Sequence, residues 1–271
     1  MTGARPDSMD RWAAGTAYDA FMGRWSRPLA REFLAALSLP RHAHWLELGC
    51  GTGALTEAIL ETQEPAAVVA CEPAAPLLDH ARQRIVHPLV AFRMAGAGEL
   101  PRDEPLFDVA ISSLVLNFVP DPRAAVKEMA ALCRSGGHIA ACVWDYAGEM
   151  EFLRLFWDAA CGLDPSARVL DEGSRFPLCR QEALEALFQA AGLEEVSVGS
   201  VAIATVFESF EDYWLPLLGG TGPAPSYVAS LTRARQADLA DRLRTAMPAD
   251  GALRARAWTV AGLVPDEGMR A

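Results

Sequence analysis

Two carboxylates and three glycines near residue 50 carry the clearest chemistry of the sequence. Glu47 ends an apolar run, and Gly49, Gly51 and Gly53 follow it at alternate positions. Alternate glycines let the backbone adopt positive φ angles, and they let a ligand approach where a Cβ atom would collide. Glu72 ends the next apolar run about twenty residues on, where a carboxylate can bind ribose hydroxyls. The pattern predicts a strand, a tight turn and a helix that bind an adenosine-containing ligand.

Two such ligands fit the turn, and Glu47 distinguishes them. Gly49, Gly51 and Ala54 satisfy the G-x-G-x-x-G/A pattern of dinucleotide-binding turns, which favours NAD(P). A pyrophosphate above the turn would be repelled by a carboxylate two residues before it, whereas the ammonium and sulfonium groups of S-adenosylmethionine would be attracted. The alternative for Glu47 is a strand-end acid that points to solvent. We therefore expect S-adenosylmethionine, with an NAD(P)-dependent oxidoreductase as the alternative.

The composition excludes several other classes of protein. The 271 residues carry a net charge of −11, which argues against a nucleic-acid partner. The six cysteines include no C-x-x-C pair, so we expect free thiols in a reducing compartment and no metal site. The N-terminus has no apolar leader and no stretch approaches the length of a membrane span. The sequence thus predicts a cytoplasmic protein without membrane association.

The order of the elements predicts an α/β fold with a parallel sheet. Short apolar strands alternate with helical patterns, which is typical of a sheet covered on both faces. Strands are expected at 43–48, 67–72, 89–94, 107–112, 137–144, 194–206 and 252–264, and helices at 54–62, 74–86, 122–134, 149–161, 180–191 and 226–246. Pro28 divides the helical pattern of 16–38, so we expect two shorter helices there. We predict an N-terminal helical lid over 1–40 and a core over 41–271, with a helical cap inserted at about 207–250.

Four segments together resemble a known family. "ELGCGTG" (47–53) resembles motif I of class I S-adenosylmethionine-dependent methyltransferases, and "VVACEPAAPLLDHAR" (68–82) resembles their second strand and its acidic end. "AGAGELP" (95–101) is similar to their adenine loop, and residues 107–145 are similar to their fourth and fifth strand units. The variant looks closest to the ubiquinone/menaquinone-type and related small-molecule methyltransferases. The resemblance implies a Rossmann-like, seven-stranded and mostly parallel sheet with helices on both faces.

The resemblance also implies roles for individual residues. The three glycines of the turn would surround the methionine part of the cofactor, with Glu47 near its ammonium group. Glu72 would bind the ribose, and Ser112 and Ser113 would lie beside the sulfonium. The adenine would lie against Pro73 and along the loop, where the implied residues are Ala97, Gly98 and Glu99. An N-terminal lid with Tyr18 and Arg27 would close over the cofactor.

Two positions depart from the family pattern. The adenine loop of relatives often carries an acid where this chain has Gly96, and Glu99 is offset from that place by three residues. Relatives often carry a histidine where this chain has Asn117, whose amide cannot titrate.

The reaction that we expect is methyl transfer by in-line displacement to a small organic acceptor, with S-adenosylhomocysteine as the product. Alignment and exclusion of water can supply most of such catalysis, so no catalytic triad is required. Candidate bases are Asp145 and Tyr146 after the fifth strand and His138 within it, although His138 also suits a plain strand entry. The alternative of another class is a non-catalytic protein that keeps the fold for binding. We expect a monomer or a homodimer.

Overall fold

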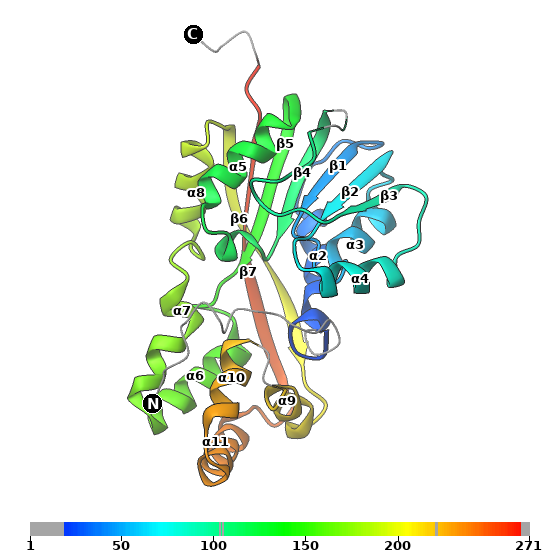
Figure 1. The fold of residues 1–271 in the computed structure, drawn as a ribbon. Helices are drawn as coiled ribbons and strands as arrows, with labels where there is room; N and C mark the ends of the chain where they lie inside the picture. The colour runs from blue at the N-terminus through cyan, green and yellow to red at the C-terminus, as the bar shows by residue number, and fades with distance from the viewer. Residues whose placement is uncertain (1–18, 103, 105, 220–221, 267–271) are drawn as a thin grey trace. The chain divides into compact units, whose positions relative to one another are not determined.

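The computed structural model describes residues 19–102, 104, 106–219 and 222–266, with residues 19 and 20 described by their backbone alone. A seven-stranded sheet has the strand order β3-β2-β1-β4-β5-β7-β6 (Figure 1). Its strands are β1 (His44–Leu48), β2 (Ala67–Cys71), β3 (Val90–Arg93), β4 (Phe107–Ser113), β5 (Cys133–Trp144), β6 (Glu194–Val206) and β7 (Ala252–Leu263).

The strands from β3 to β5 run parallel. β1 pairs in parallel with β2 and β4, β2 with β3, and β4 with β5. The amide of Gly136 donates to Val264 and that of Asp145 donates to Arg256, so β7 runs antiparallel to β5. β1, β2 and β4 are buried at every position except one end, as expected of parallel strands covered on both faces. The predicted α/β class, with a Rossmann-like and mostly parallel sheet of seven strands, is confirmed.

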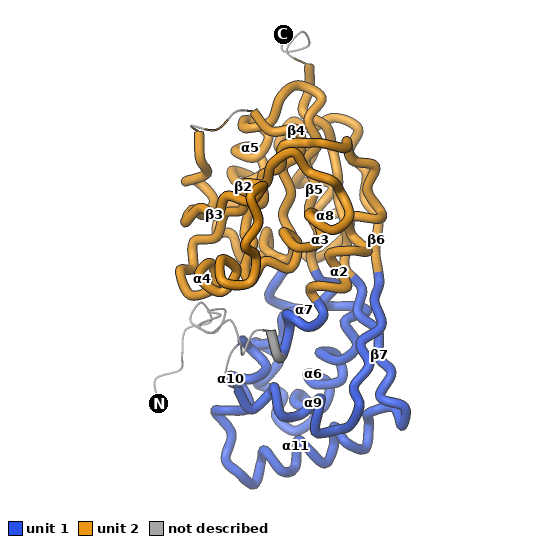
Figure 2. Tube along the Cα trace, turned by 90° about the vertical axis from the view of Figure 1, so that its right-hand side faces the viewer, with its two compact units in different colours: residues 1–25, 144–177, 202–256 blue, residues 26–143, 178–201, 257–271 orange. Residues whose placement is uncertain are grey.

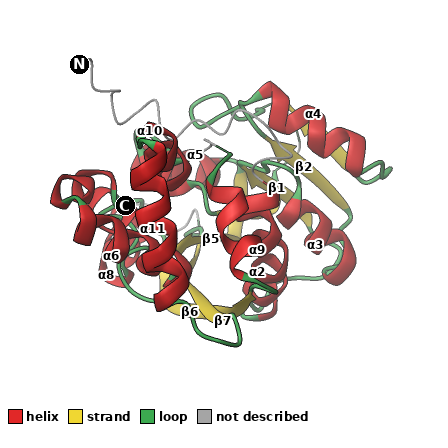
Figure 3. Cartoon of the chain, turned by 90° about the horizontal axis from the view of Figure 1, so that it is seen from below, coloured by secondary structure: helices red, strands yellow, loops and turns green. Residues whose placement is uncertain are grey.

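Helices and loops connect these strands (Figure 3). The helical segments are η2 (Asp19–Gly23), α2 (Arg24–Ala35), α3 (Ala54–Thr62), α4 (Ala75–Arg84), η3 (Leu116–Phe118), α5 (Pro122–Ala131), α6 (Glu151–Leu163), η4 (Pro165–Leu170), α7 (Glu172–Arg175), α8 (Gln181–Ala190), α9 (Phe210–Leu217), α10 (Pro223–Ser230) and α11 (Arg233–Ala246). Within the described part of the chain, no helix is both long and apolar enough to cross a membrane.

The chain divides into two compact units (Figure 2). Unit 1 comprises residues 1–25, 144–177 and 202–256, and unit 2 comprises residues 26–143, 178–201 and 257–271. Unit 2 contains β1 to β4 with α3, α4 and α5. These elements lie on either side of the glycine turn and Glu72 in the sequence. The division into a lid over 1–40 and a core with a cap at about 207–250 stays a prediction.

Aromatic side chains form the core of unit 1. The ring of Phe207 lies against Trp25, Phe152 and Tyr213, with centroids 5.1–6.1 Å apart. The hydroxyl of Tyr213 donates a hydrogen bond of 2.9 Å to the carbonyl of Phe152. Phe152 and Tyr213 are buried, so these rings stabilise the unit by packing.

Two of the expected helix boundaries are wrong. α2 runs through Pro28 without a break, and the change of helix type occurs at Gly23, where the π-helical turn η2 ends. The residue four before the proline is Arg24, which begins α2, so the missing hydrogen bond falls at the helix start. The single helix expected over 226–246 is two helices, because Leu231 is extended and Thr232 accepts a hydrogen bond from the amide of Arg235 as the N-cap of α11.

Candidate functional site

The turn between β1 and α3 is built from glycines in the left-handed region. Gly49, Gly51 and Gly53 have φ angles of 79°, 54° and 87°, which confirms the prediction of positive φ at alternate positions. The amides of Gly49 and Cys50 both donate to the carbonyl of Cys71, at 2.8 and 2.9 Å. The turn is thus fixed to the end of β2, the strand that leads into Glu72.

The three glycines have different surroundings. A Cβ atom on Gly49 would lie 2.4 Å from the side chain of Val115, and one on Gly53 would lie 2.6 Å from Ile85. A Cβ atom on Gly51 would meet no heavy atom within 4 Å. Packing against Val115 therefore disfavours a side chain at Gly49, the contact at Gly53 is with the flexible end of Ile85, and the space above Gly51 is open to a ligand.

The carboxylate of Glu72 joins the glycine turn to the start of α4. Oε2 accepts the amide of Gly51 at 3.0 Å, and Oε1 accepts the amide of Ala74 at 2.9 Å. The side chain is buried, and burial raises its pKa against the opposing effect of these two hydrogen bonds. A carboxylate has about four acceptor sites, so two remain for the hydroxyls of a ribose.

Glu47 is buried beneath the turn and does not point to solvent, so the alternative of an exposed strand-end acid is wrong. It is 1% exposed, and its Oε2 accepts the hydroxyl of Thr56 at 2.5 Å. Burial raises the pKa of Glu47 to about 7, helped by the neighbouring charge of Glu72 and opposed by the Thr56 hydroxyl. Thr56 lies in the first turn of α3, and no sequence pattern singled it out.

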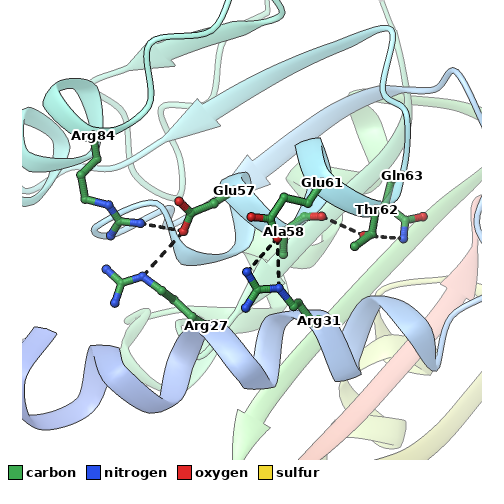
Figure 4. A network of polar contacts seen from close by, with 8 residues as sticks. All are labelled: Arg27, Arg31, Glu57, Ala58, Glu61, Thr62, Gln63 and Arg84. Atoms are coloured by element: carbon green, nitrogen blue, oxygen red, sulfur yellow. Dashed lines mark hydrogen bonds and ion pairs between the residues drawn. The ribbon is translucent and has the colours of Figure 1, made fainter.

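Arg27 lies on the face of α2 that faces α3 (Figure 4). Its Nε is 3.7 Å from Oε2 of Glu57, and the guanidinium of Arg84 lies 2.7 Å from the same oxygen. Arg84 also donates to the carbonyl of Thr52 in the turn, at 3.4 Å. Arg27 therefore contacts the helix that follows the turn, and its predicted contact with the cofactor stays a prediction. Tyr18, the other candidate from the N-terminal segment, lies outside the described residues.

The loop expected to hold the adenine is bound to α5. Glu128 accepts the amide of Gly98 at 2.6 Å and the amide of Leu100 at 3.2 Å. Gly98 has a φ angle of 90°, and Glu99 is exposed. Sequence analysis missed Glu128, because one glutamate within a helical pattern 30 residues beyond the loop carries no local signal. Ala97 lies within this loop, and Pro73 packs against its Gly96, since a Cβ atom there would lie 3.3 Å from the proline ring.

The two serines at the end of β4 differ in their contacts. The hydroxyl of Ser112 is buried and donates to the carbonyl of Leu48 at 2.9 Å, so it joins β4 to β1. Ser113 is partly exposed, and its Oγ lies 3.3 Å from Sγ of Cys142. Leu114 follows with a φ of 63°, which is rare for a leucine and typical of strained backbone at functional sites.

The three candidate bases do not all belong to one unit. Asp145 and Tyr146 belong to unit 1, whereas His138 belongs to unit 2 and pairs with Val109 near the start of β4. Burial, with some help from the charge of Arg134, lowers the pKa of His138.

Asp145 is buried and fully hydrogen-bonded. Its Oδ2 accepts Nε and Nη2 of Arg256, at 3.1 and 2.7 Å, and the amide of Glu149 at 2.8 Å. Its Oδ1 accepts the amide of Gly148 at 3.1 Å. Tyr146 is buried with its ring 5.5 Å from that of Phe176. Asp145 is thus built as an anchor for the segment that follows β5.

The described side chains form no cluster of metal ligands. Over the described ranges, no three His, Cys, Asp or Glu side chains lie close enough to hold a metal ion together. Burial raises the pKa of the thiols of Cys133 and Cys142 to about 12, so neither is activated as a nucleophile.

Known proteins are similar to this chain over its central segment. The family described as "Methyltransferase domain" matches residues 46–141. The chain is 33% identical to the biotin biosynthesis bifunctional protein BioCD of Bordetella avium over 47% of this chain and 28% of that protein. It is 31% identical to the trans-aconitate 2-methyltransferase of Rhizobium etli over 53% of this chain and 54% of that protein.

Solved structures extend the likeness of the fold. The phosphoethanolamine N-methyltransferase 2 of Haemonchus contortus, solved in complex with S-adenosyl-L-methionine, superposes with a TM-score of 0.61 at 14% identity. That comparison covers 97% of this chain and 61% of that one. The matched region spans 28–64% of the length of the curated relatives. The family match over residues 46–141 includes the glycine turn, Glu47, Glu72, the loop at 95–101 and Glu128, so this segment of the chain is a methyltransferase domain.

Proposed function

We propose that the protein transfers the methyl group of S-adenosylmethionine to a small organic acceptor. The observation that carries this proposal is the pair of buried carboxylates at the glycine turn. Glu47 lies beneath the turn with no cationic partner among the described residues, and Glu72 binds the turn itself. A ligand with an ammonium group and a ribose supplies a partner for each.

The residues present fit this cofactor. The open space above Gly51 admits the ligand to the turn, where the carboxylate of Glu72 has acceptor sites left for a ribose. Glu47 would bind the ammonium group in its ionised form, and the loop at 97–98 would contact the adenine. The bound cofactor supplies an activated methyl group, and the protein contributes alignment and exclusion of water.

A dinucleotide suits the same turn less well. The pyrophosphate of NAD(P) would sit over the turn, where it would keep the buried carboxyl of Glu47 protonated or be repelled by it. The names of the curated relatives also support a small acceptor, since they include methyltransferases of trans-aconitate, demethylmenaquinone and phosphatidylethanolamine.

The catalytic assignments are finer proposals. For an acceptor that must lose a proton, we propose Asp145 or Tyr146 as the base in preference to His138. His138 pairs with the beginning of β4, away from the strand ends where sites of such sheets lie. The bonds of Asp145 to Arg256 give it a second task as an anchor. The cytoplasmic location remains the one that the cysteine usage predicts.

Calorimetric titration with S-adenosylmethionine, S-adenosylhomocysteine and NADH tests the proposal. Wild type should bind the two sulfur nucleosides and not NADH, and Glu72→Ala should lose this binding because both the ribose contact and the turn are lost. Glu61→Ala is the matched control, since it removes an exposed glutamate of α3 that pairs with Arg31 of α2 (Figure 4). Binding of NADH alone would favour the alternative of an NAD(P)-dependent oxidoreductase. Cofactor binding without product from any acceptor in a panel of carboxylic acids, phenols and amines would favour the non-catalytic alternative.

A further inference from the structure

Glu128 makes the contact that shapes the adenine loop. It lies on the second turn of α5, is 8% exposed, and places one oxygen 2.6 Å from the amide of Gly98 and the other 3.2 Å from that of Leu100. Its ion-pair partner, Arg102, is 3.8 Å away with a side chain that is 73% exposed, so that pair is weak. The backbone amides of the loop are therefore the main partners of this carboxylate.

The loop needs such a partner to keep its conformation. Gly98 is in the left-handed region at a φ of 90°, and the amide of Glu99 closes a turn onto the carbonyl of Gly96 at 3.0 Å. A Cβ atom on Gly98 would meet no heavy atom within 4 Å, so neighbouring side chains do not hold that residue in place. Leu100 is buried and anchors only the end of the loop.

We propose that Glu128 is a positioning residue for recognition of the adenine, an inference that rests on the proposed function. By accepting the amides of Gly98 and Leu100, its carboxylate fixes the backbone of residues 97–98, which line the adenine edge. Gly96 has no side chain to offer, so within this contact the negative charge comes from the neighbouring helix α5. Each of the two backbone amides donates to a different oxygen of Glu128. Only a carboxylate provides two acceptor oxygens, because a side-chain amide has an NH2 donor in place of one of them.

The test compares Glu128→Gln with wild type in two measurements. The first is amide hydrogen exchange of Gly98 and Leu100 by NMR in the ligand-free protein, where Glu128→Gln should exchange roughly tenfold faster. The second is calorimetry with S-adenosylhomocysteine and with S-inosylhomocysteine, in which a carbonyl replaces the exocyclic amine. Wild type should prefer the adenine form, and Glu128→Gln should lose roughly tenfold of that preference.

Asp121→Ala is the matched control. Asp121 is the N-cap of α5 and accepts the amide of Ala124 at 2.9 Å, so its loss destabilises the same helix without touching the loop. Asp121→Ala should lower Tm and leave the adenine preference unchanged. Glu128→Asp keeps the charge and should retain part of the preference, and it replaces Glu128→Gln where that variant does not fold.

The outcomes separate the two proposals. An unchanged preference in a folded Glu128 variant overturns the positioning role, and so does an equal loss of preference in Asp121→Ala. Wild type that binds neither nucleoside overturns the proposed function, and this inference with it. Exchange at Gly98 that does not change in Glu128→Gln shows that the carboxylate does not hold the loop, which also refutes the inference.

Discussion

We expect the ionisation of Glu47 to make cofactor binding pH-dependent. Glu47 has a pKa of about 7 because burial disfavours its charge. Near pH 7 it is therefore half protonated, and an ammonium group is attracted only to the ionised half. Binding of S-adenosylhomocysteine should consequently release a proton and strengthen as the pH rises.

The size of the effect follows from this pKa. The apparent Kd scales with one plus the ratio of proton concentration to the acid dissociation constant of Glu47, a factor of about 1.1 at pH 8 and about 11 at pH 6 for a pKa of about 7. Affinity for S-adenosylhomocysteine should thus fall about tenfold between pH 8 and pH 6, or about 1.4 kcal/mol.

The pH dependence of folding stability has the opposite sign to that of cofactor binding. The folded-state pKa lies above the ordinary 4.5, so the folded protein keeps a proton that the unfolded chain loses between pH 4.5 and 7. The free energy of unfolding should therefore fall as the pH rises through this window, by roughly 3 kcal/mol at most from this group.

Calorimetry at pH 6, 7 and 8 on wild type and Glu47→Gln measures the effect on binding. Adenosine serves as the second ligand, because it carries the ribose that Glu72 would bind but no ammonium group. The pH dependence of S-adenosylhomocysteine binding should exceed that of adenosine in wild type, and this excess should vanish in Glu47→Gln. A Kd that is constant from pH 6 to pH 8, or an excess that survives in Glu47→Gln, refutes the reasoning.

Three further predictions concern Thr56, the glycine turn and Asp145. Thr56→Val removes the hydroxyl that stabilises ionised Glu47, so the midpoint of the binding profile should move above pH 7; an unmoved midpoint contradicts this. Gly49→Ala should lower the free energy of unfolding by about 3 kcal/mol through collision and left-handed strain, whereas Gly51→Ala should cost about 1 kcal/mol and chiefly weaken cofactor binding. Urea denaturation measures the loss of stability in each variant, and calorimetry measures the loss of cofactor binding. Equal losses in Gly49→Ala and Gly51→Ala would contradict this prediction. Asp145→Asn should lower the free energy of unfolding by about 2–3 kcal/mol, because it breaks a buried ion pair. A stable variant with no turnover would instead make Asp145 a base alone.

The architecture was predictable wherever a pattern is local. Alternating apolar runs and helical repeats located the parallel strands, because a strand covered on both faces must be apolar along its length. The break near Leu231 and the continuity through Pro28 were not predictable. The first depends on where an exposed threonine caps a helix, and the second on a π-helical turn that moves the helix start to within four residues of the proline.

The sequence pattern indicated which residues belong to the candidate site, but not what each of them contacts. The three glycines look alike in the sequence, yet Gly49 packs against Val115, Gly53 lies next to Ile85, and of the three only Gly51 faces open space. Both packing partners are distant in the sequence, so only the fold could identify them. Glu128 was missed for the same reason, since its importance depends on a contact across 30 residues.

The unpaired state of Glu47 is the strongest link between this fold and its ligand. A buried carboxylate costs free energy unless a cation or several donors compensate it. Over the residues that the structure describes, Glu47 has the hydroxyl of Thr56 and no basic side chain, whereas the equally buried Asp145 has Arg256 and two amides. A carboxylate needed only for stability would be expected to have partners like those of Asp145. We therefore propose that the ligand brings the cation that Glu47 lacks, as the ammonium group of S-adenosylmethionine would, whereas a dinucleotide would place its anionic pyrophosphate over this turn.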